Sequence, residues 1–400
     1  MKFELNLVRM GRWSVVAAGA AIPVSVTATS IFVFLSVMAE LVSGSYRRNK
    51  NIVIHHPVVQ VALLLFAWLT VSLFYTSAPL DEAFRVLEKY RELLLIALLL
   101  PLFLEEKWRR RGLHAFIAAM LITLFLSYLK YFGLIDFGTG APNEGTIFKH
   151  RITQNVFMSF AGLWTTLQLL NNSRRWLWGI LLALIAYNIF FQVGGRIGYI
   201  IFPSLISLIV YRRFGWKRAL VASALFILIF TLLFFISDIF HQRIAFMFSN
   251  IEQYLQGKYK ESTALRLSFY KNTLELIQQK PWAGYGIGSF RQEYAQYVKG
   301  SAFPATAHPH NEYLLIGVQS GIVGVILFVC LLLTMWLASL RMPDNYAILM
   351  QGMVITMAIG CMFNSFLLDS AEGHLFAFIT ALCCATWSPS LQKPPCSQSP

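Results

Sequence analysis

Two histidines stand where a long polar stretch of the chain meets an apolar one. His308 and His310 belong to the sequence Ala307-His308-Pro309-His310-Asn311, and a run of apolar residues follows it. Asn311 is a favourable N-cap for a helix that begins in this run. Such a helix would direct its free N–H groups and the positive end of its dipole towards His310. We therefore predict that a phosphate or a developing anion is held beside His310.

The histidines themselves allow more than one role. An unperturbed imidazole titrates near pH 6.5, so either ring is suited to act as a base or as a phosphate contact. They could instead only cap the helix or form half of a metal site. Two histidines without neighbouring cysteines or well-placed carboxylates are a weak metal signal, and we predict neither a metal site nor a cofactor. A functional role and a structural one remain open for His308 and His310.

Two arginines are suited to bind phosphate. Arg196 lies in a glycine-rich turn (194–198), where the missing side chains allow a ligand to approach the backbone. Arg266 lies in the polar stretch before the histidines, and a guanidinium group can bind phosphate through two parallel hydrogen bonds. Arg291 follows in the same stretch and is a further candidate for substrate binding, although an arginine at a membrane boundary usually anchors the chain.

Two more basic clusters are candidates for substrate binding. Lys149, His150 and Arg151 precede an apolar run, and Arg85 and Lys89 are four residues apart, on one face of a helix. Each cluster could guide an anionic head group or merely anchor its helix. We expect acidic lipid head groups as their ordinary partners.

The composition is that of a membrane protein. Of the 400 residues, 57% are hydrophobic and only 13% are charged, which is typical of a chain that crosses a bilayer many times. The five cysteines lie in apolar runs or near the C-terminus, so no disulfide framework or zinc site is indicated.

The apolar runs predict an all-α polytopic membrane protein with about twelve transmembrane helices, since a helix needs roughly 20 residues to cross a bilayer. The first two runs share one apolar stretch that is broken at Pro23, so they could form a hairpin or a single helix. The candidate ranges are 13–24, 27–44, 57–77, 90–105, 113–133, 153–170, 176–193, 197–211, 217–236, 311–339, 346–366 and 373–389.

The polar stretch 237–310 separates the ninth run from the tenth. Its apolar residues recur at helical spacing near 263–279, and Pro281 ends this predicted helix. A glycine-rich turn follows at 284–288. We expect one membrane domain (1–400) with one large, partly helical loop (237–310).

The net charge of +14 does not indicate a nucleic-acid partner. With the N-terminus in the cytoplasm, lysines and arginines gather in every second loop, as the positive-inside rule requires. Arg47, Arg48, Arg174 and Arg175 are examples. Most of the charge is therefore a topology signal. It predicts that the loop 237–310 faces the periplasm and that 390–400 form a short cytoplasmic tail.

One motif resembles the signature of a known family. His310-Asn311, nine residues (312–320) and then Gly321-Ile322-Val323-Gly324 resemble the signature of the bacterial O-antigen ligases. The O-antigen polymerases and the protein O-oligosaccharyltransferases belong to the same superfamily. The turn Gly195-Arg196-Ile197-Gly198 resembles the arginine turn that these proteins carry earlier in the chain.

The loop strengthens the resemblance and departs from it at one position. Arg266 occupies the place of the family's loop arginine, but Tyr270 stands where the family has leucine. The segment 281–290 is similar to the family's Pro/Gly-rich segment. The predicted topology matches over nearly the whole chain, whereas the specific motifs cover only a few dozen residues.

The resemblance implies a glycosyltransferase of lipopolysaccharide biosynthesis. Such an enzyme transfers O-antigen polysaccharide from undecaprenyl pyrophosphate to lipid A–core oligosaccharide at the periplasmic face of the bacterial inner membrane, without metal or ATP and with inversion. Arg196 and Arg266 would hold the pyrophosphate, and His310 would act as base or as phosphate contact. Asn311 would orient His310, and His308 would assist. The basic clusters would recruit the phosphorylated acceptor.

Three alternatives follow from the same sequence. An O-antigen polymerase would use the same donor with a lipid-linked acceptor. A protein O-oligosaccharyltransferase is less favoured, because no additional C-terminal periplasmic domain is expected. A transporter of lipid-linked sugars would need a polar path through the membrane, and the apolar runs carry few charges near their centres.

Overall fold

The computed structural model describes residues 2–141, 144–236, 262–301 and 303–387, with a few isolated positions between 242 and 249. Within these ranges the chain is built of helices and turns and contains no β-strand, which confirms the predicted all-α class. The predicted tail 390–400 and the first part of the predicted loop lie outside the described residues.

A helix occupies each of the predicted apolar ranges. In chain order these helices are α1 (Lys2–Ala21), α2 (Val26–Val42), α4 (Pro57–Val71), α6 (Glu92–Leu99), α7 (Glu106–Tyr131), α8 (Arg151–Asn171), α9 (Arg175–Tyr187), α10 (Gly198–Phe214), α11 (Trp216–Ile236), α15 (Glu312–Ser339), α16 (Asp344–Phe363) and α17 (Ser370–Cys384).

Shorter elements connect these helices. They are α3 (Ser45–Ile54), α5 (Leu80–Lys89), α13 (Ser262–Gln279), α14 (Phe290–Tyr297) and the single turns η1 (Ser72–Tyr75), η2 (Leu100–Phe103) and η3 (Asn188–Gln192). Helix α13 confirms the helix predicted near 263–279.

Some of the helices have the length and hydropathy that a membrane span needs. Among the described residues, six helices are long and apolar enough to cross a membrane by themselves, and α2 with α3, bent by 103°, makes a seventh if the pair counts as one span. Helix α6 with η2, and α17, are apolar but shorter. About twelve spans therefore remains a prediction. The six helices are α4 with η1, α7, α9 with η3, α11, α15 and α16.

The break at Pro23 forms a hairpin. Helix α1 ends at Ala21, and α2 begins after Ser25, whose hydroxyl accepts a hydrogen bond from the backbone N–H of Ala28. The two helices then pack along each other. Of the two interpretations of this apolar stretch, the hairpin is correct.

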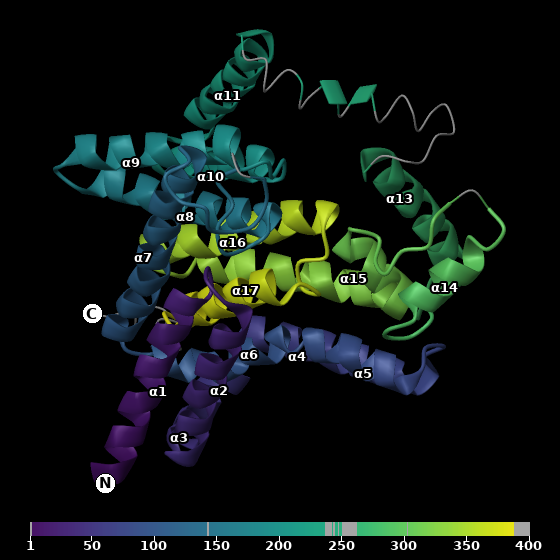
Figure 1. The fold of residues 1–400 in the computed structure, drawn as a ribbon. Coiled ribbons are helices and arrows are strands. Elements are labelled where there is room, and N and C mark those ends of the chain that lie inside the picture. Colours follow the sequence, from purple (N-terminus) through teal and green to yellow (C-terminus); the bar gives the residue numbers. More distant parts are fainter. Residues whose placement is uncertain are drawn as a thin grey trace, which may run out of the picture.

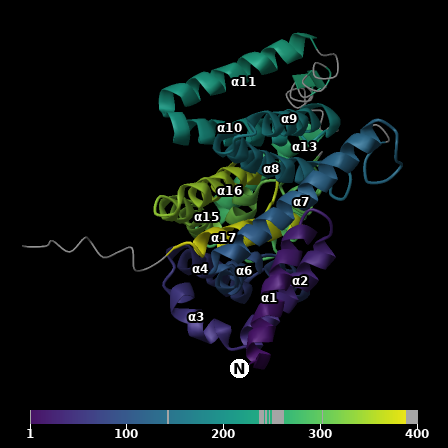
Figure 2. The same ribbon diagram turned by 90° about the vertical axis from the view of Figure 1, so that its left-hand side faces the viewer.

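Helices that are far apart in the sequence contact one another at the centre of the bundle. Figure 1 shows α15, α16 and α17 in the middle, with α4 and α6 on one side of them and α8 and α10 on the other. Helix α11 lies at the edge, beside α10, in both Figure 1 and Figure 2. Helices α13 and α14 lie at one end of α15, where the chain enters the bundle again.

Helix α15 is broken where its sequence carries the glycine motif. Gly321 has φ 67° and ψ −169°, so the carbonyls before it lose their helical partners. The glycine-rich turn replaces those partners. The N–H of Tyr285 donates to the Val318 carbonyl (2.8 Å), and the N–H of Gly286 donates to the Gln319 carbonyl (2.9 Å). The segment after Pro281 is thereby fixed to the break in the helix.

We expect Gly321→Ala to destabilise the protein strongly. A Cβ atom at Gly321 would lie 2.1 Å from the Trp282 carbonyl oxygen, and the backbone there is left-handed. The clash and the strain together should lower the free energy of unfolding by about 3 kcal/mol or more. Thermal unfolding in detergent measures the effect.

Gly133→Ala is the matched control. Gly133 has φ 71°, and a Cβ atom there would meet nothing within 4 Å. Gly133→Ala should therefore lower the free energy of unfolding only by the backbone strain, about 1 kcal/mol. Equal losses in the two variants would contradict the close packing of the loop on α15.

Candidate functional site

Four predicted site residues lie at the end of the bundle where α13, the start of α15 and the connection between α16 and α17 (364–369) meet: Arg266, His308, His310 and Asn311. Asn311 caps α15 as predicted, since its side-chain oxygen accepts the N–H of Leu314 at 3.1 Å. The cap places the first free N–H groups of α15 next to His310. The predicted cap at Asn311 is confirmed.

His310 has an unusual backbone. It is the one residue other than glycine with positive φ (56°) in the part of the chain that the structure describes. Its Nδ1 lies 3.4 Å from the Asn364 side-chain oxygen, and its ring lies 4.2 Å from that of His308. Strained conformations of this kind persist where the surroundings fix them, and they cluster at active sites.

The end of α16 fixes the elements that carry these residues. The Met362 carbonyl accepts a hydrogen bond from the Asn311 amide (3.1 Å). The Tyr270 hydroxyl lies within hydrogen-bonding distance of the carbonyls of Met362 (2.8 Å) and His310 (3.1 Å). Arg266 donates to the Phe363 carbonyl (3.2 Å). Tyr270, which stands where the O-antigen ligases have leucine, thus joins α13 to the histidine and to α16.

Burial keeps His310 neutral. The pKa of the imidazole is lowered to about 4, mainly by burial and also by the nearby His308 and Arg266, against the hydrogen bond to Asn364, which raises it. Burial also lowers the pKa of His308, against the influence of Asp369. At neutral pH the ring of His310 therefore has a lone pair that can accept a proton.

Three arginines lie close enough to affect one another. Burial is the main cause that lowers the pKa of Arg266 and Arg196, and nearby positive charge lowers each of them further. Arg266 is affected by Arg196 and Arg151, and Arg196 is affected by Arg151. Like charges held together in partly buried positions favour an anion between them.

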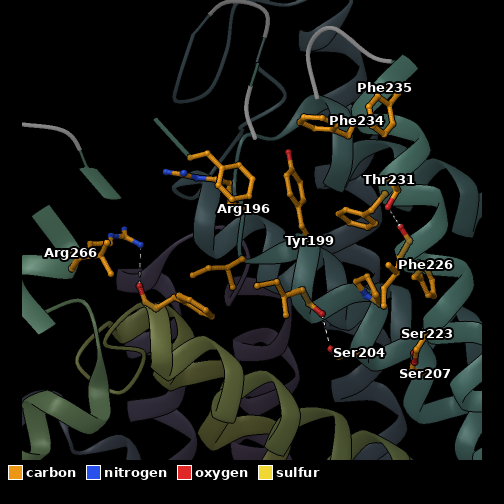
Figure 3. A pocket seen from close by; sticks show the side chains of 18 of the residues that line it. Arg196, Tyr199, Ser204, Ser207, Ser223, Phe226, Thr231, Phe234, Phe235 and Arg266 are labelled. Atoms are coloured by element: carbon orange, nitrogen blue, oxygen red, sulfur yellow. Dashed lines mark hydrogen bonds between the residues drawn. The ribbon is translucent and has the colours of Figure 1, made fainter. Parts of the chain in front are cut away.

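The arginines stand at one end of an open groove of about 1080 Å³ between α10 and α11. Figure 3 shows Arg196 and Arg266 on one side of this pocket and Ser207, Ser223 and Phe226 on the other. The remaining lining is mainly apolar and aromatic. It includes Ile197, Tyr199, Ile200, Pro203, Ile227, Phe230, Phe234 and Phe235.

The structure brings other predicted residues close to the carboxylates of Asp369 and Glu372. Lys149 is buried, which lowers the pKa of its amine, and it lies near Glu372. Lys89 and His150 are exposed, but their charges reach Asp369, and that of Lys89 also reaches His308. Basic and acidic side chains are therefore mixed here, beside the histidines.

Two predicted residues are not brought to the site. Arg85 is exposed and pairs with Asp81 at 2.7 Å. Arg291 is exposed on α14. Among the described residues, no hydrogen bond or ion pair joins either arginine to the histidines or to the groove.

Sequence reasoning misses the residues of the α16–α17 connection. The Asn364 amide donates to the Asp369 carboxylate at 2.9 Å, while its oxygen faces His310. Glu312 and Glu372 are buried beside them. The available signal is the occurrence of polar residues between two apolar helices, because ionisable groups at such positions usually have a function.

The apolar helices are those of a multi-pass membrane protein, and basic side chains gather at one end of them. Residues 180–329 match the model of a family described as O-antigen ligase, and this range includes Arg196, Arg266 and His310. The match covers this part of the chain and confirms the resemblance found in the sequence.

Two curated proteins are similar over a short segment. One is from Rickettsia conorii and one from Rickettsia felis, and both are named as candidate polysaccharide ligases. Each is 36% identical over 86 residues, which is 20% of this chain. The chain spans about a fifth of the length of these relatives (20% and 21%).

The low pKa of His310 predicts a pH-dependent stability. Between about pH 6.5 and 4 the unfolded chain binds a proton at this residue that the folded chain does not. The free energy of unfolding therefore falls as the pH is lowered through this window. We expect the unfolding temperature of His310→Asn to fall less than that of the wild type between pH 7 and 4.5.

His55→Asn, at an exposed position, is the matched control and should follow the wild-type profile. Thermal unfolding at a series of pH values measures all three proteins. A profile of His310→Asn parallel to that of the wild type would show that the folded protein does not depress the pKa of His310.

Proposed function

We propose that this protein transfers O-antigen polysaccharide from undecaprenyl pyrophosphate to a sugar hydroxyl of lipid A–core oligosaccharide, at the periplasmic face of the inner membrane. One observation carries the proposal. Arg196 and Arg266 stand at the end of an apolar groove, and a neutral histidine, His310, lies beside Arg266. The family match supports the same reaction class.

The groove is suited to a lipid-linked pyrophosphate. Its apolar lining between α10 and α11 would hold part of the isoprenoid chain, and the arginines at its end would bind the two phosphates. Arg151 adds positive charge to the same place. The sugar attached to the pyrophosphate would then extend towards His310.

His310 would act as the base. The Asn364 amide donates to Asp369, so the Asn364 oxygen is left to accept the proton on Nδ1 of His310. The lone pair then lies on Nε2. This nitrogen would take the proton of the acceptor hydroxyl while that oxygen forms a bond to the anomeric carbon from the face opposite the pyrophosphate.

The arginines would stabilise the group that leaves. The bond between the anomeric carbon and the pyrophosphate oxygen breaks with its electron pair on the oxygen. Arg196 and Arg266 would hold this developing negative charge in a partly buried site, where the interaction is stronger than in water. The anomeric carbon is inverted.

The acceptor would approach from the side of Lys89, Lys149 and His150. Positive charge there suits the phosphates of lipid A–core oligosaccharide. A polymerase would use the same donor site and would differ in the acceptor.

We expect His310→Ala, Arg196→Ala and Arg266→Ala each to lower transfer by about 100-fold or more. The measurement uses the purified protein in detergent with undecaprenyl-pyrophosphate-linked O-antigen and lipid A–core. Lys299→Ala is the control, because Lys299 is exposed on the loop outside the groove. Full transfer by one of the three variants would remove that residue from the mechanism.

The product identifies the reaction. Polysaccharide on lipid A–core supports the ligase, whereas an elongated lipid-linked donor supports a polymerase. Transfer to neither acceptor by folded wild-type protein would favour a transporter of lipid-linked sugars.

A second prediction tests the groove. The rise per residue of an α-helix puts Ser207 about 14 Å along α10 from Gly198. The Ser207 hydroxyl lies 3.1 Å from the hydroxyl of Ser223 on α11. Ser207→Trp should fill this part of the groove and exclude the isoprenoid chain. We expect a KM about tenfold higher for the undecaprenyl donor and little change for a donor with a short isoprenoid.

Leu333→Trp is the matched control, since Leu333 is 57% exposed on α15 and does not line the groove. Equal effects of Ser207→Trp on the long and the short donor would contradict the placement of the lipid chain between α10 and α11.

A further inference from the structure

A buried carboxylate lies directly behind the histidine site. Glu312 is the first residue of α15 and is 0% exposed. One of its oxygens accepts a hydrogen bond from the Tyr90 hydroxyl (2.8 Å), and the other accepts one from the N–H of Leu367 (3.1 Å). Because Glu312 is fully enclosed, it cannot touch a substrate, and the proposed chemistry does not use it.

The partners of Glu312 connect it to two other parts of the chain. Tyr90, between α5 and α6, is also 0% exposed, and the Gln319 side chain lies close to its hydroxyl. Gln319 in turn accepts a hydrogen bond from the N–H of Gly288 in the glycine-rich turn (2.6 Å). A continuous set of buried polar groups therefore leads from that turn to Leu367.

Leu367 belongs to the same short connection as Asn364, the residue that faces His310. Tyr270, Asn311 and Arg266 hold the end of α16 at one side of this connection. Glu312 holds its interior through a main-chain N–H group. The connection can move relative to His310 only if one of these bonds is broken.

We propose that Glu312 is a positioning residue for His310. Together with Tyr90 it fixes the connection 364–369, so that the Asn364 oxygen stays opposite Nδ1 of His310 and the lone pair stays on Nε2. The effect on transfer rests on the proposed function. The orientation of the His310 imidazole can be measured whether or not the protein catalyses that transfer. Glu312 acts through Leu367 and Asn364 and does not exchange a proton with the substrate.

Glu312→Ala and Glu312→Gln should have different effects, because only glutamine keeps polar atoms for the partners of Glu312. Glu312→Ala leaves the Tyr90 hydroxyl and the N–H of Leu367 without an acceptor in a dry interior. Glu312→Gln keeps an oxygen for Leu367, and its amide can donate to the Tyr90 oxygen. A positioning role therefore predicts rescue by glutamine and loss with alanine.

The test measures transfer kinetics and the binding of undecaprenyl pyrophosphate for Glu312→Ala, Glu312→Gln and Tyr90→Phe. We expect Glu312→Ala to lower kcat about 100-fold, the size of effect that a misplaced catalytic group produces. The Kd for undecaprenyl pyrophosphate should stay within twofold, because the arginines are untouched. Glu312→Gln should stay within fivefold of the wild-type kcat, and Tyr90→Phe should fall between the two.

Glu40→Ala is the matched control. Glu40 is a second carboxylate that is buried in a helix, 1% exposed on α2, and within the described chain no hydrogen bond joins it to the connection 364–369. Its removal should leave kcat unchanged. If Glu312→Ala lowers the unfolding temperature but not kcat, or if Glu312→Gln is as inactive as Glu312→Ala, the proposal is wrong.

A spectroscopic readout separates this proposal from the proposed function. The ¹⁵N signals of the His310 ring, identified by their loss in His310→Asn, report which nitrogen carries the proton. We expect a single Nδ1–H form in the wild type and a mixture of both forms in Glu312→Ala. Unchanged ring signals in Glu312→Ala would overturn the proposal, even if the wild type catalyses transfer. A mixture of the two forms would support the proposal, even if the wild type does not catalyse transfer.

Discussion

The structure depends on one requirement of an apolar interior, namely that backbone polar groups cannot stay unpaired there. Where α16 ends, its carbonyls and the N–H groups of the following connection need partners. Arg266, Tyr270, Asn311 and Glu312 supply them from α13 and α15. The groups that satisfy the backbone are therefore the same groups that surround His310, so folding and assembly of the site are one process.

The second determinant is partial burial, which acts in opposite ways on the two kinds of site residue. It makes the charged imidazole of His310 unfavourable and so leaves a neutral base. The guanidinium groups of Arg196 and Arg266 keep their charge, because arginine is not deprotonated in proteins. Burial then strengthens their attraction for an anion. A base and an anion site can thus lie side by side without neutralising each other.

Local patterns in the sequence predict much of this arrangement, and long-range contacts the rest. The apolar runs, the helix at 262–279 and the cap at Asn311 follow from neighbouring residues and were predictable. The bond between Glu312 and Leu367 joins residues 55 positions apart and depends on which helices are neighbours. The number of spans does not follow from the apolar runs alone either, because α6 and α17 are shorter than the other apolar helices and are largely buried against neighbouring helices.

The break in α15 has a consequence for how this chain can be recombined with its relatives. The turn 284–288 supplies the hydrogen bonds that the helix lacks around Gly321, and Gly284 approaches the Val318 carbonyl so closely that a Cβ atom would lie 2.3 Å from it. The loop is therefore not an independent module on a membrane scaffold. In a chimera, the segment from Pro281 to Gly288 has to be exchanged together with its own α15, because backbone hydrogen bonds join the two.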